Sequence, residues 1–169
     1  MRELHCSICG SAFVRVAYQE GRIERLLSRI NVFPFRCQLC TNRFRAFYSG
    51  ARHSTQAFDR CQYTRLPASI EAQVLDYKQP AVTNRITDIS MDGCTLQATG
   101  FPKGSFIELV LKPTVEDETI RIETAMVCSV HPLSIGVRFL EILPEHHRRL
   151  AQVVLGLLVG QGLDPALNS

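Results

Sequence analysis

Asp88-Ile89-Ser90-Met91-Asp92-Gly93 is the stretch that decides the fold, because it sets a polar turn between two runs of alternating apolar residues. Before the turn, residues 82–89 have the period of two that is typical of a strand buried on one face. After the turn the alternation resumes in Cys94, Leu96 and Ala98. The stretch therefore predicts two strands joined by a tight turn that carries the polar residues Asp88, Ser90 and Asp92.

Further strands are predicted on both sides of this pair. The same alternation occurs in residues 68–74, 105–112, 120–128 and 135–139. In the third of these runs, one face is expected to consist of Ile120, Ile122, Thr124, Met126 and Cys128. Six short strands with few helical breaks favour a closed antiparallel barrel or a sandwich, so the fold class is mainly β.

A helix is predicted after the last strand. It begins at Leu143-Pro144-Glu145, with proline in the first turn and an acid near the positive end of the helix dipole. Gly160 and Gly162 end it. Its apolar stripe consists of Leu150, Val153, Val154, Leu157 and Leu158. We expect the stripe to pack over one opening of the barrel, with binding to a partner as the alternative.

A second polar motif precedes the first predicted strand. The stretch Asp59-Arg60-Cys61-Gln62-Tyr63-Thr64-Arg65-Leu66-Pro67 carries two arginines. An arginine grips a phosphate or a purine edge with two parallel charged hydrogen bonds, which a lysine does not reproduce. In the turn, a carboxylate can accept guanine N–H groups, a hydroxyl can bind phosphate and a glycine permits close approach. The predicted ligand site consists of Arg60, Arg65, Asp88, Ser90 and Gly93.

From about residue 59 to residue 158 the chain resembles a PilZ domain, the family of six-stranded barrels that bind the bacterial second messenger cyclic di-GMP. The likeness rests on Arg65-Leu66-Pro67, on Asp88 to Cys94, and on Ile135-Gly136-Val137-Arg138-Phe139-Leu140. The resemblance implies a six-stranded antiparallel β-barrel with a C-terminal helix. It also implies that cyclic di-GMP binds at the mouth of the barrel, where the arginine arm closes over the nucleotide.

The arginine arm departs from the usual Arg-x-x-x-Arg pattern of the family. With Arg65 as the second arginine, Cys61 occupies the first position and Arg60 lies one residue earlier. Two functions stay open. One is a cyclic di-GMP receptor that couples nucleotide binding to an attached zinc ribbon. The other is a degenerate PilZ-like adaptor that does not bind cyclic di-GMP and acts through protein or nucleic-acid contacts.

Four of the seven cysteines form two pairs, Cys6 with Cys9 and Cys37 with Cys40, each with CxxC spacing. Each tight turn places two thiolates on one side, and two such turns together make a four-thiolate site typical of structural Zn²⁺. A redox-active dithiol is the alternative. Four protein thiolates leave no open position on the metal, so metal catalysis is not expected. The segment at residues 3–47 resembles a zinc ribbon.

The insert between the cysteine pairs has its own pattern. Residues 19–30 have a helical period, with apolar residues on one side and arginines on the other. The apolar residues are Ile23, Leu26, Leu27 and Ile30, and the arginines are Arg22, Arg25 and Arg29. After the second pair, Phe44 and Phe47 are expected to cover the metal site.

Charge divides the chain in two. Residues 1–65 contain eleven arginines and no lysine against four acids, whereas the remainder is mildly acidic. We predict a zinc-ribbon-like module at 1–48, a linker at 49–59, the barrel with its helix at 60–163 and a tail at 164–169. The basic front indicates phosphate or acidic partners. We expect a protein partner bound through the ribbon or the C-terminal helix, with nucleic acid as a weaker candidate.

No catalytic set is evident: a Ser/His/Asp trio, a glycine-rich phosphate loop and paired acids in apolar surroundings are all missing from the sequence. An enzyme is therefore not expected. The sequence begins without an apolar signal segment and its longest apolar stretch is too short to cross a bilayer, which predicts a cytoplasmic protein with no membrane contact.

Overall fold

The computed structural model describes residues 4–48, 63–76, 79–113 and 118–160. These residues form two compact units, the first ending at Thr64 and the second running from Arg65 to Gly160. Each unit is described by itself. The linker predicted at 49–59 and the tail predicted at 164–169 lie outside the described residues.

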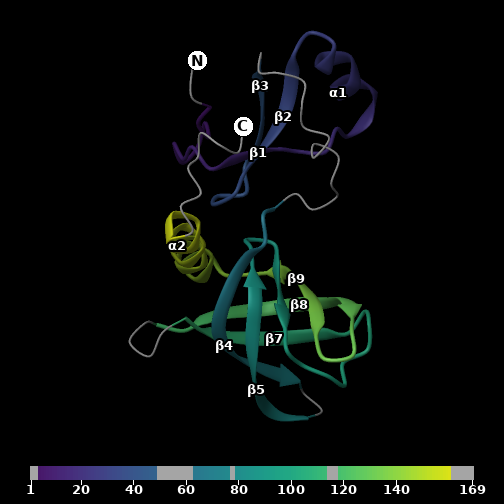
Figure 1. The fold of residues 1–169 in the computed structure, drawn as a ribbon, viewed down its shortest axis with the longest axis vertical. Coiled ribbons are helices and arrows are strands. Elements are labelled where there is room, and N and C mark those ends of the chain that lie inside the picture. Colours follow the sequence, from purple (N-terminus) through teal and green to yellow (C-terminus); the bar gives the residue numbers. More distant parts are fainter. Residues whose placement is uncertain (1–3, 49–62, 77–78, 114–117, 161–169) are drawn as a thin grey trace. The chain divides into compact units, whose positions relative to one another are not determined.

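The second unit is a closed barrel of six antiparallel strands (Figure 1). The strands are β4 (Leu66–Asp76), β5 (Gln79–Ile89), β6 (Gly93–Leu96), β7 (Phe106–Lys112), β8 (Ile120–Val130) and β9 (Ile135–Glu141). Around the barrel they follow the order β4-β5-β6-β9-β8-β7. The predicted six-stranded antiparallel barrel is confirmed.

Aliphatic side chains from all six strands fill the barrel. Burying one of them fully stabilises the fold by about 1.5–3 kcal/mol, which is why alternation along each strand is a strong signal. The largest of these fully buried side chains include Leu66, Ile86, Ile89, Leu96, Leu109, Leu111, Ile120, Ile122 and Ile135.

β8 corrects one prediction. Its buried positions begin with Ile120 and Ile122 but continue with Ala125 and Val127. The register between β8 and β9 shifts at Thr124, where a β-bulge or irregularity interrupts the pairing. One extra residue moves all following side chains to the opposite face of the strand. Thr124, Met126 and Cys128 therefore do not share the buried face with the two isoleucines.

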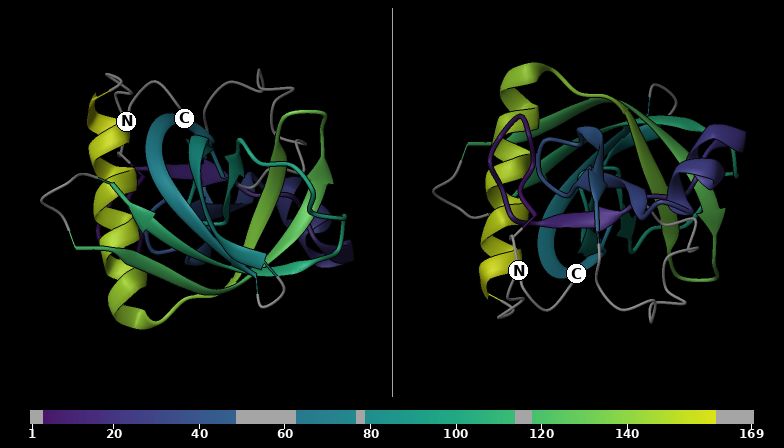
Figure 2. Two further views of the ribbon diagram at one scale, coloured as in Figure 1. Left: turned by 90° about the horizontal axis from the view of Figure 1, so that it is seen from below. Right: turned by 90° about the horizontal axis from the view of Figure 1, so that it is seen from above.

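The helix α2 (Pro144–Gly160) follows the barrel and packs against β8 and β4 (Figure 2). Leu150, Val154 and Leu158 are buried in this contact, so the predicted stripe belongs to the core of the unit. The backbone N–H of Leu143 donates to Oε2 of Glu123 at 3.2 Å, just before the helix begins. Among the described helices, none is long and apolar enough to cross a membrane.

The first unit contains a three-stranded antiparallel sheet in the order β1-β2-β3 and one short helix (Figure 1). The elements are β1 (Val14–Val16), α1 (Gly21–Ser28), β2 (Val32–Cys37) and β3 (Arg43–Phe47). Its small core is built on Cys6, Val14, Phe35 and Cys37. The predicted helix at 19–30 is thus present but shorter.

The two phenylalanines of β3 have different surroundings. Phe44 packs on the core that contains Cys6 and Cys37, with its ring centroid 6.0 Å from that of Phe35. Phe47 is 65% exposed, so the prediction that it covers the metal site is wrong. Successive side chains of a strand point to opposite faces, and these two are three positions apart, so they lie on opposite faces of the sheet.

Candidate functional site

A polar cluster joins the starts and ends of three barrel strands. Arg65, just before β4, donates from Nη1 to Oδ1 of Asp88 at 2.9 Å and to Oγ1 of Thr95 at 3.0 Å. The Thr95 hydroxyl donates in turn to Oδ1 of Asp88 at 3.0 Å. Strand register brings the residues together, because Asp88 pairs with Pro67 of β4 and with Thr95 of β6. The fold thereby brings Arg65 of the predicted arginine arm next to Asp88 of the polar turn.

The Arg65–Asp88 ion pair orients the arginine more than it stabilises the fold. Both bonds use one nitrogen, Nη1, and 45% of the Arg65 side chain is exposed. Ion pairs this exposed contribute about 0–1 kcal/mol to stability, because water screens them. What they provide is a preferred direction for the guanidinium group. A ligand that binds this group therefore meets a donor whose orientation is already set.

The turn between β5 and β6 is held by its own serine. The Ser90 hydroxyl donates to the carbonyl of Gly93 at 3.2 Å and accepts from the backbone N–H of Asp92 at 3.3 Å. The backbone N–H of Ser90 also donates to the Gly93 carbonyl, at 2.8 Å. Ser90 is buried. Its hydroxyl is thus engaged in shaping the turn, a role that the sequence also allows for this residue type.

Gly93 is required by the close approach of β6 to β9. A Cβ atom on Gly93 would lie 2.1 Å from the carbonyl oxygen of Val137, which is backbone and has little freedom to move. Gly93 pairs with Arg138 across the two strands, so any displacement disturbs the ladder beside the turn. The glycine at the end of the motif therefore serves strand packing directly.

Gly93→Ala should lower the free energy of unfolding by about 3 kcal/mol, the upper range for overpacking a well-packed site. Gly156→Ala is the matched control, because a Cβ there meets nothing within 4 Å and lies in α2. That change should raise stability by up to about 1 kcal/mol through helix propensity. Urea denaturation measures both. Equal stability of Gly93→Ala and the parent would contradict the close approach.

Two residues at this site were not singled out from the sequence, Thr95 and Arg138. Nε of Arg138 lies 3.6 Å from Oδ2 of Asp92, and the Phe139 N–H donates to the Asp92 carbonyl at 2.9 Å. Thr95 could have been found from its spacing, since residues two apart on a strand share a face with Gly93. Arg138 faces Gly93 only through strand register. Of the predicted ligand residues, Arg60 lies outside the described residues.

Cys94 lies beside the cluster, but its thiol is not expected to be reactive. It is fully buried. Burial raises the pKa of its thiol above the usual value, and the charge of Asp88 adds to the rise while that of Arg65 opposes it. A thiol held neutral and inaccessible does not act as a nucleophile.

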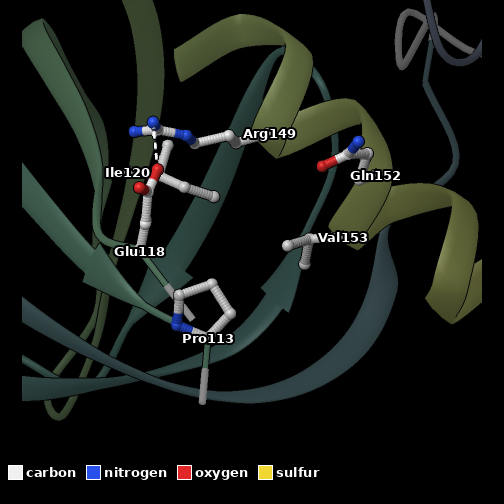
Figure 3. Close-up of a pocket in the computed structure, with 6 residues that line it drawn as sticks. All are labelled: Pro113, Glu118, Ile120, Arg149, Gln152 and Val153. Carbon is white, nitrogen blue, oxygen red and sulfur yellow. Dashed lines mark ion pairs between the residues drawn. The ribbon is translucent and has the colours of Figure 1, made fainter. Parts of the chain in front are cut away.

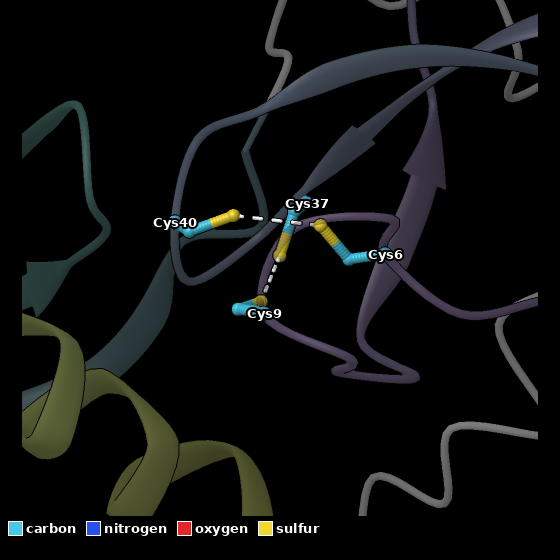
Figure 4. Close-up of side chains that lie close together, drawn as sticks. All are labelled: Cys6, Cys9, Cys37 and Cys40. Atoms are coloured by element: carbon cyan, nitrogen blue, oxygen red, sulfur yellow. Dashed lines mark hydrogen bonds between the residues drawn. The ribbon is translucent and has the colours of Figure 1, made fainter.

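The four predicted metal ligands converge in the first unit (Figure 4). The sulfur atoms of Cys6 and Cys40 are 3.5 Å apart, those of Cys9 and Cys37 are 3.6 Å apart, and all four lie within 4.8 Å of one another. Zn–S bonds of about 2.3 Å in a tetrahedron require sulfur atoms about 3.8 Å apart. The cluster is compatible with a zinc-binding module.

The backbone favours thiolate at one position of this cluster. Burial raises the pKa of Cys6, but hydrogen bonds from the backbone of Cys9 and Ile8 outweigh it and lower the pKa to about 6. Burial raises the pKa of Cys37 and Cys40. Four clustered thiolates repel one another, so a bound cation is the natural way to hold them together.

The residues just before Arg65 are bound to the cysteine module. The Thr64 N–H donates to Oε1 of Gln38 at 2.8 Å, and Gln38 lies between two cysteines of the second pair. Arg36 donates to the Tyr63 hydroxyl at 3.1 Å, and its guanidinium carbon lies 5.6 Å from the centre of that ring. The chain then passes directly from Thr64 to Arg65.

A cavity of about 380 Å³ lies elsewhere in the second unit, beside α2 (Figure 3). An ion pair between Glu118 and Arg149 spans it. Its lining residues are Pro113, Glu118, Ile120, Arg149, Gln152 and Val153. None of them belongs to the polar cluster around Arg65, so the cavity is separate from the candidate ligand site.

Comparison with solved structures shows the fold. The PilZ domain with c-di-GMP of YcgR from Escherichia coli is 17% identical, with a TM-score of 0.50 over 61% of this chain and 95% of that chain. YcgR in complex with c-di-GMP, from the same organism, is 13% identical, with a TM-score of 0.53 over 92% and 78% of the two chains. MrkH of K. pneumonia in its apo state is 14% identical, with a TM-score of 0.55 over 88% and 77%.

Comparison with protein families is more specific than these distant likenesses. No curated protein sequence matches the chain. The PilZ domain family, however, matches residues 59–156, which contain the whole barrel, the polar turn and most of α2. Together with the barrel topology and the cluster around Arg65, this match shows that the chain belongs to the PilZ family, a family of cyclic di-GMP receptors.

Proposed function

We propose that this protein is a cyclic di-GMP receptor in the bacterial cytoplasm. One observation supports this most: Arg65 is oriented by Asp88 and Thr95 beside the polar turn, yet nearly half of its side chain is exposed. A phosphate or guanine edge can be bound by the exposed part of the guanidinium group. PilZ family membership makes cyclic di-GMP the ligand of choice for this arrangement.

Each residue of the proposed ligand site has a distinct role. Arg65 supplies a fork of donors, and Arg60 is proposed as the second arginine in place of the usual one. Asp88 holds Arg65 in position and offers its carboxylate to guanine N–H groups. Ser90 and Gly93 hold the turn and its close approach to β9, so that the backbone of the turn keeps its shape.

Titration calorimetry with cyclic di-GMP tests this function. The zinc-loaded full chain should release or absorb heat in a saturable titration at micromolar ligand. The same titration with GMP should be silent, since a mononucleotide lacks the second guanine and phosphate that a paired-arginine site recognises. Absence of heat up to high micromolar cyclic di-GMP, from protein shown to be folded, would instead favour the adaptor that acts without nucleotide.

The second part of the proposal concerns the cysteine module. We propose that a structural Zn²⁺ ion binds Cys6, Cys9, Cys37 and Cys40, because their sulfur atoms gather at a spacing close to that of a tetrahedral zinc site. The ion would order the turn that contains Gln38. Gln38 and Arg36 bind Thr64 and Tyr63, the two residues that precede Arg65.

We propose that this connection couples the zinc ribbon to the ligand site. Anchoring Thr64 restricts the backbone one residue before Arg65 and so lowers the ordering cost of binding. Linkage works in both directions. A ligand that favours one conformation of the arm must also favour the conformation of the ribbon residues that bind the arm. Nucleotide binding would then be communicated to the ribbon, which carries the surface for a partner.

A further inference from the structure

The helix α1 presents its apolar residues to solvent. Ile23, Leu26 and Ile30 are 70%, 63% and 61% exposed. Their spacing of three and seven residues places them on one side of the helix and of the turn that ends it. An amphipathic helix in a small domain normally buries such a row against its sheet, so the orientation of α1 is the reverse of the usual one.

A buried ionic contact fixes this reversed orientation. Glu24 is buried, with Oε2 2.7 Å from Nη2 of Arg43 and Oε1 3.3 Å from Nη2 of Arg45. Its Oε2 also accepts the backbone N–H of Glu20 at 2.6 Å. Leaving Glu24 buried without its partners would cost several kcal/mol, so the helix cannot readily roll to bury its apolar row.

β3 carries an exposed aromatic side chain, Phe47, close to the segment that follows α1. Phe47 lies two residues after Arg45 and so shares the face of the sheet on which α1 is anchored. It pairs with Val32, and the Tyr48 N–H donates to the carbonyl of Asn31, the residue that follows Ile30. We call the surface made by Ile23, Leu26, Ile30 and Phe47 the α1 patch. Large apolar side chains gathered in this way on a small unit mark an interaction surface.

Positive charges predominate beside the α1 patch. Arg22, Arg25 and Arg29 are exposed and lie along one flank of the apolar row. The two acids of the helix region are already engaged, Glu24 with Arg43 and Arg45, and Glu20 with Arg43 at 2.7 Å. An occupant must therefore bring both an apolar row and acidic groups. A second copy of this chain that docked through its own α1 would face arginine with arginine.

We infer that the α1 patch is the docking site for an acidic amphipathic helix of a partner protein. Two helices pack through apolar rows at 8–10 Å, with the charges on their flanks paired. The arginines lie on one flank of the row, which fixes the direction from which acidic groups must come. A protein helix can match such an orientation, whereas a fluid anionic lipid surface cannot distinguish one flank from the other.

Two designed peptides test this docking site. Both form amphipathic helices of about five turns with the same leucine row, and their polar faces carry glutamate in one peptide and lysine in the other. Fluorescence anisotropy with the zinc-loaded full chain should show saturable binding of the glutamate peptide and at least about tenfold weaker binding of the lysine peptide. Equal affinities, or no saturable binding, would overturn the inference.

Variants locate the binding on the α1 patch. Leu26→Ser should weaken binding of the glutamate peptide by about tenfold or more, because one buried leucine contact is lost. Arg25→Glu combined with Arg29→Glu should reverse the preference toward the lysine peptide. Leu133→Ser is the matched control, since Leu133 is 79% exposed on the barrel and should leave both affinities unchanged. A Leu26→Ser variant as tight as the parent would place the binding elsewhere.

Cosedimentation with vesicles of phosphatidylcholine and one quarter phosphatidylglycerol tests the alternative that the α1 patch binds a membrane surface. We expect the parent and Leu26→Ser to cosediment with the vesicles to the same extent. Cosedimentation lost in Leu26→Ser, with no preference between the peptides, would assign the patch to a lipid surface instead. Cyclic di-GMP titration of Leu26→Ser should match the parent, so failure of the docking inference stays distinguishable from failure of the receptor function.

Discussion

Replacement of Arg65 by alanine should abolish measurable binding of cyclic di-GMP. A hydrogen bond to a charged group contributes about 1.5–3 kcal/mol, so loss of a two-point contact weakens binding by roughly 10²- to 10⁴-fold. The same change leaves Asp88 without the cation that neutralises it, and an uncompensated carboxylate repels the phosphates of the ligand. Titration calorimetry at up to millimolar nucleotide measures the effect.

Two controls define what the Arg65 result means. Arg65→Lys keeps the positive charge but loses the planar pair of N–H donors of the guanidinium group. We expect this variant to have less than a tenth of the parent affinity. Arg148→Ala removes one exposed arginine from α2 and should leave affinity unchanged, since the net charge changes equally in both alanine variants. Retention of parent affinity in Arg65→Ala would remove Arg65 from the ligand site and with it the proposed pocket.

Cys37→Ser should release the metal and unfold the first unit while the barrel stays folded. Structural zinc contributes about 10–16 kcal/mol in comparable small modules, more than a unit with so small a core can replace. Elemental analysis should find about one zinc per parent chain and close to none in the variant. Backbone NMR signals of β1, β2 and β3 should collapse to unfolded positions, and those of β4 to β9 should remain.

The same variant tests the coupling. If the ribbon orders the arm, Cys37→Ser should weaken cyclic di-GMP binding by about 5- to 150-fold, the usual range of coupling free energies of 1–3 kcal/mol. Cys128→Ser, a half-buried cysteine outside the cluster, should keep both the zinc and the affinity. Loss of zinc with unchanged affinity would reject the coupling but leave the metal site standing. A folded, zinc-free parent would reject the metal site.

The barrel could be predicted because its signals are local. Alternation along β6, β7 and β9 matches their buried positions, and the apolar row of α2 is buried as the helical period indicates. β5 instead buries Ile86 and Ile89, which are three positions apart, across a shift in its register with β6. β8 departs from its own alternation because of the irregularity near Thr124. A bulge arises from the fit between neighbouring strands. The sequence of one strand therefore does not reveal where its apolar residues change from one face to the other.

The residues of the candidate site could be predicted from the sequence better than the contacts between them. Arg65 and Asp88 were identified from their motifs, and strand register then placed them 2.9 Å apart. The contribution of Thr95 and the position of Arg138 depend on which strands are neighbours, and β6 pairs with β9 across a long stretch of sequence. Motifs identify residue types, whereas pairing decides which side chains meet.

The sequence by itself determined the strand pattern, the CxxC pairs and the polar turn, because each depends on residues close together along the chain. Tertiary structure alone decided the outward orientation of the α1 patch. The apolar spacing of α1 suits a buried helix, but the ion pairs of Glu24 with Arg43 and Arg45 turn that row to solvent. Those partners are about twenty residues away, and only folding brings them to the helix.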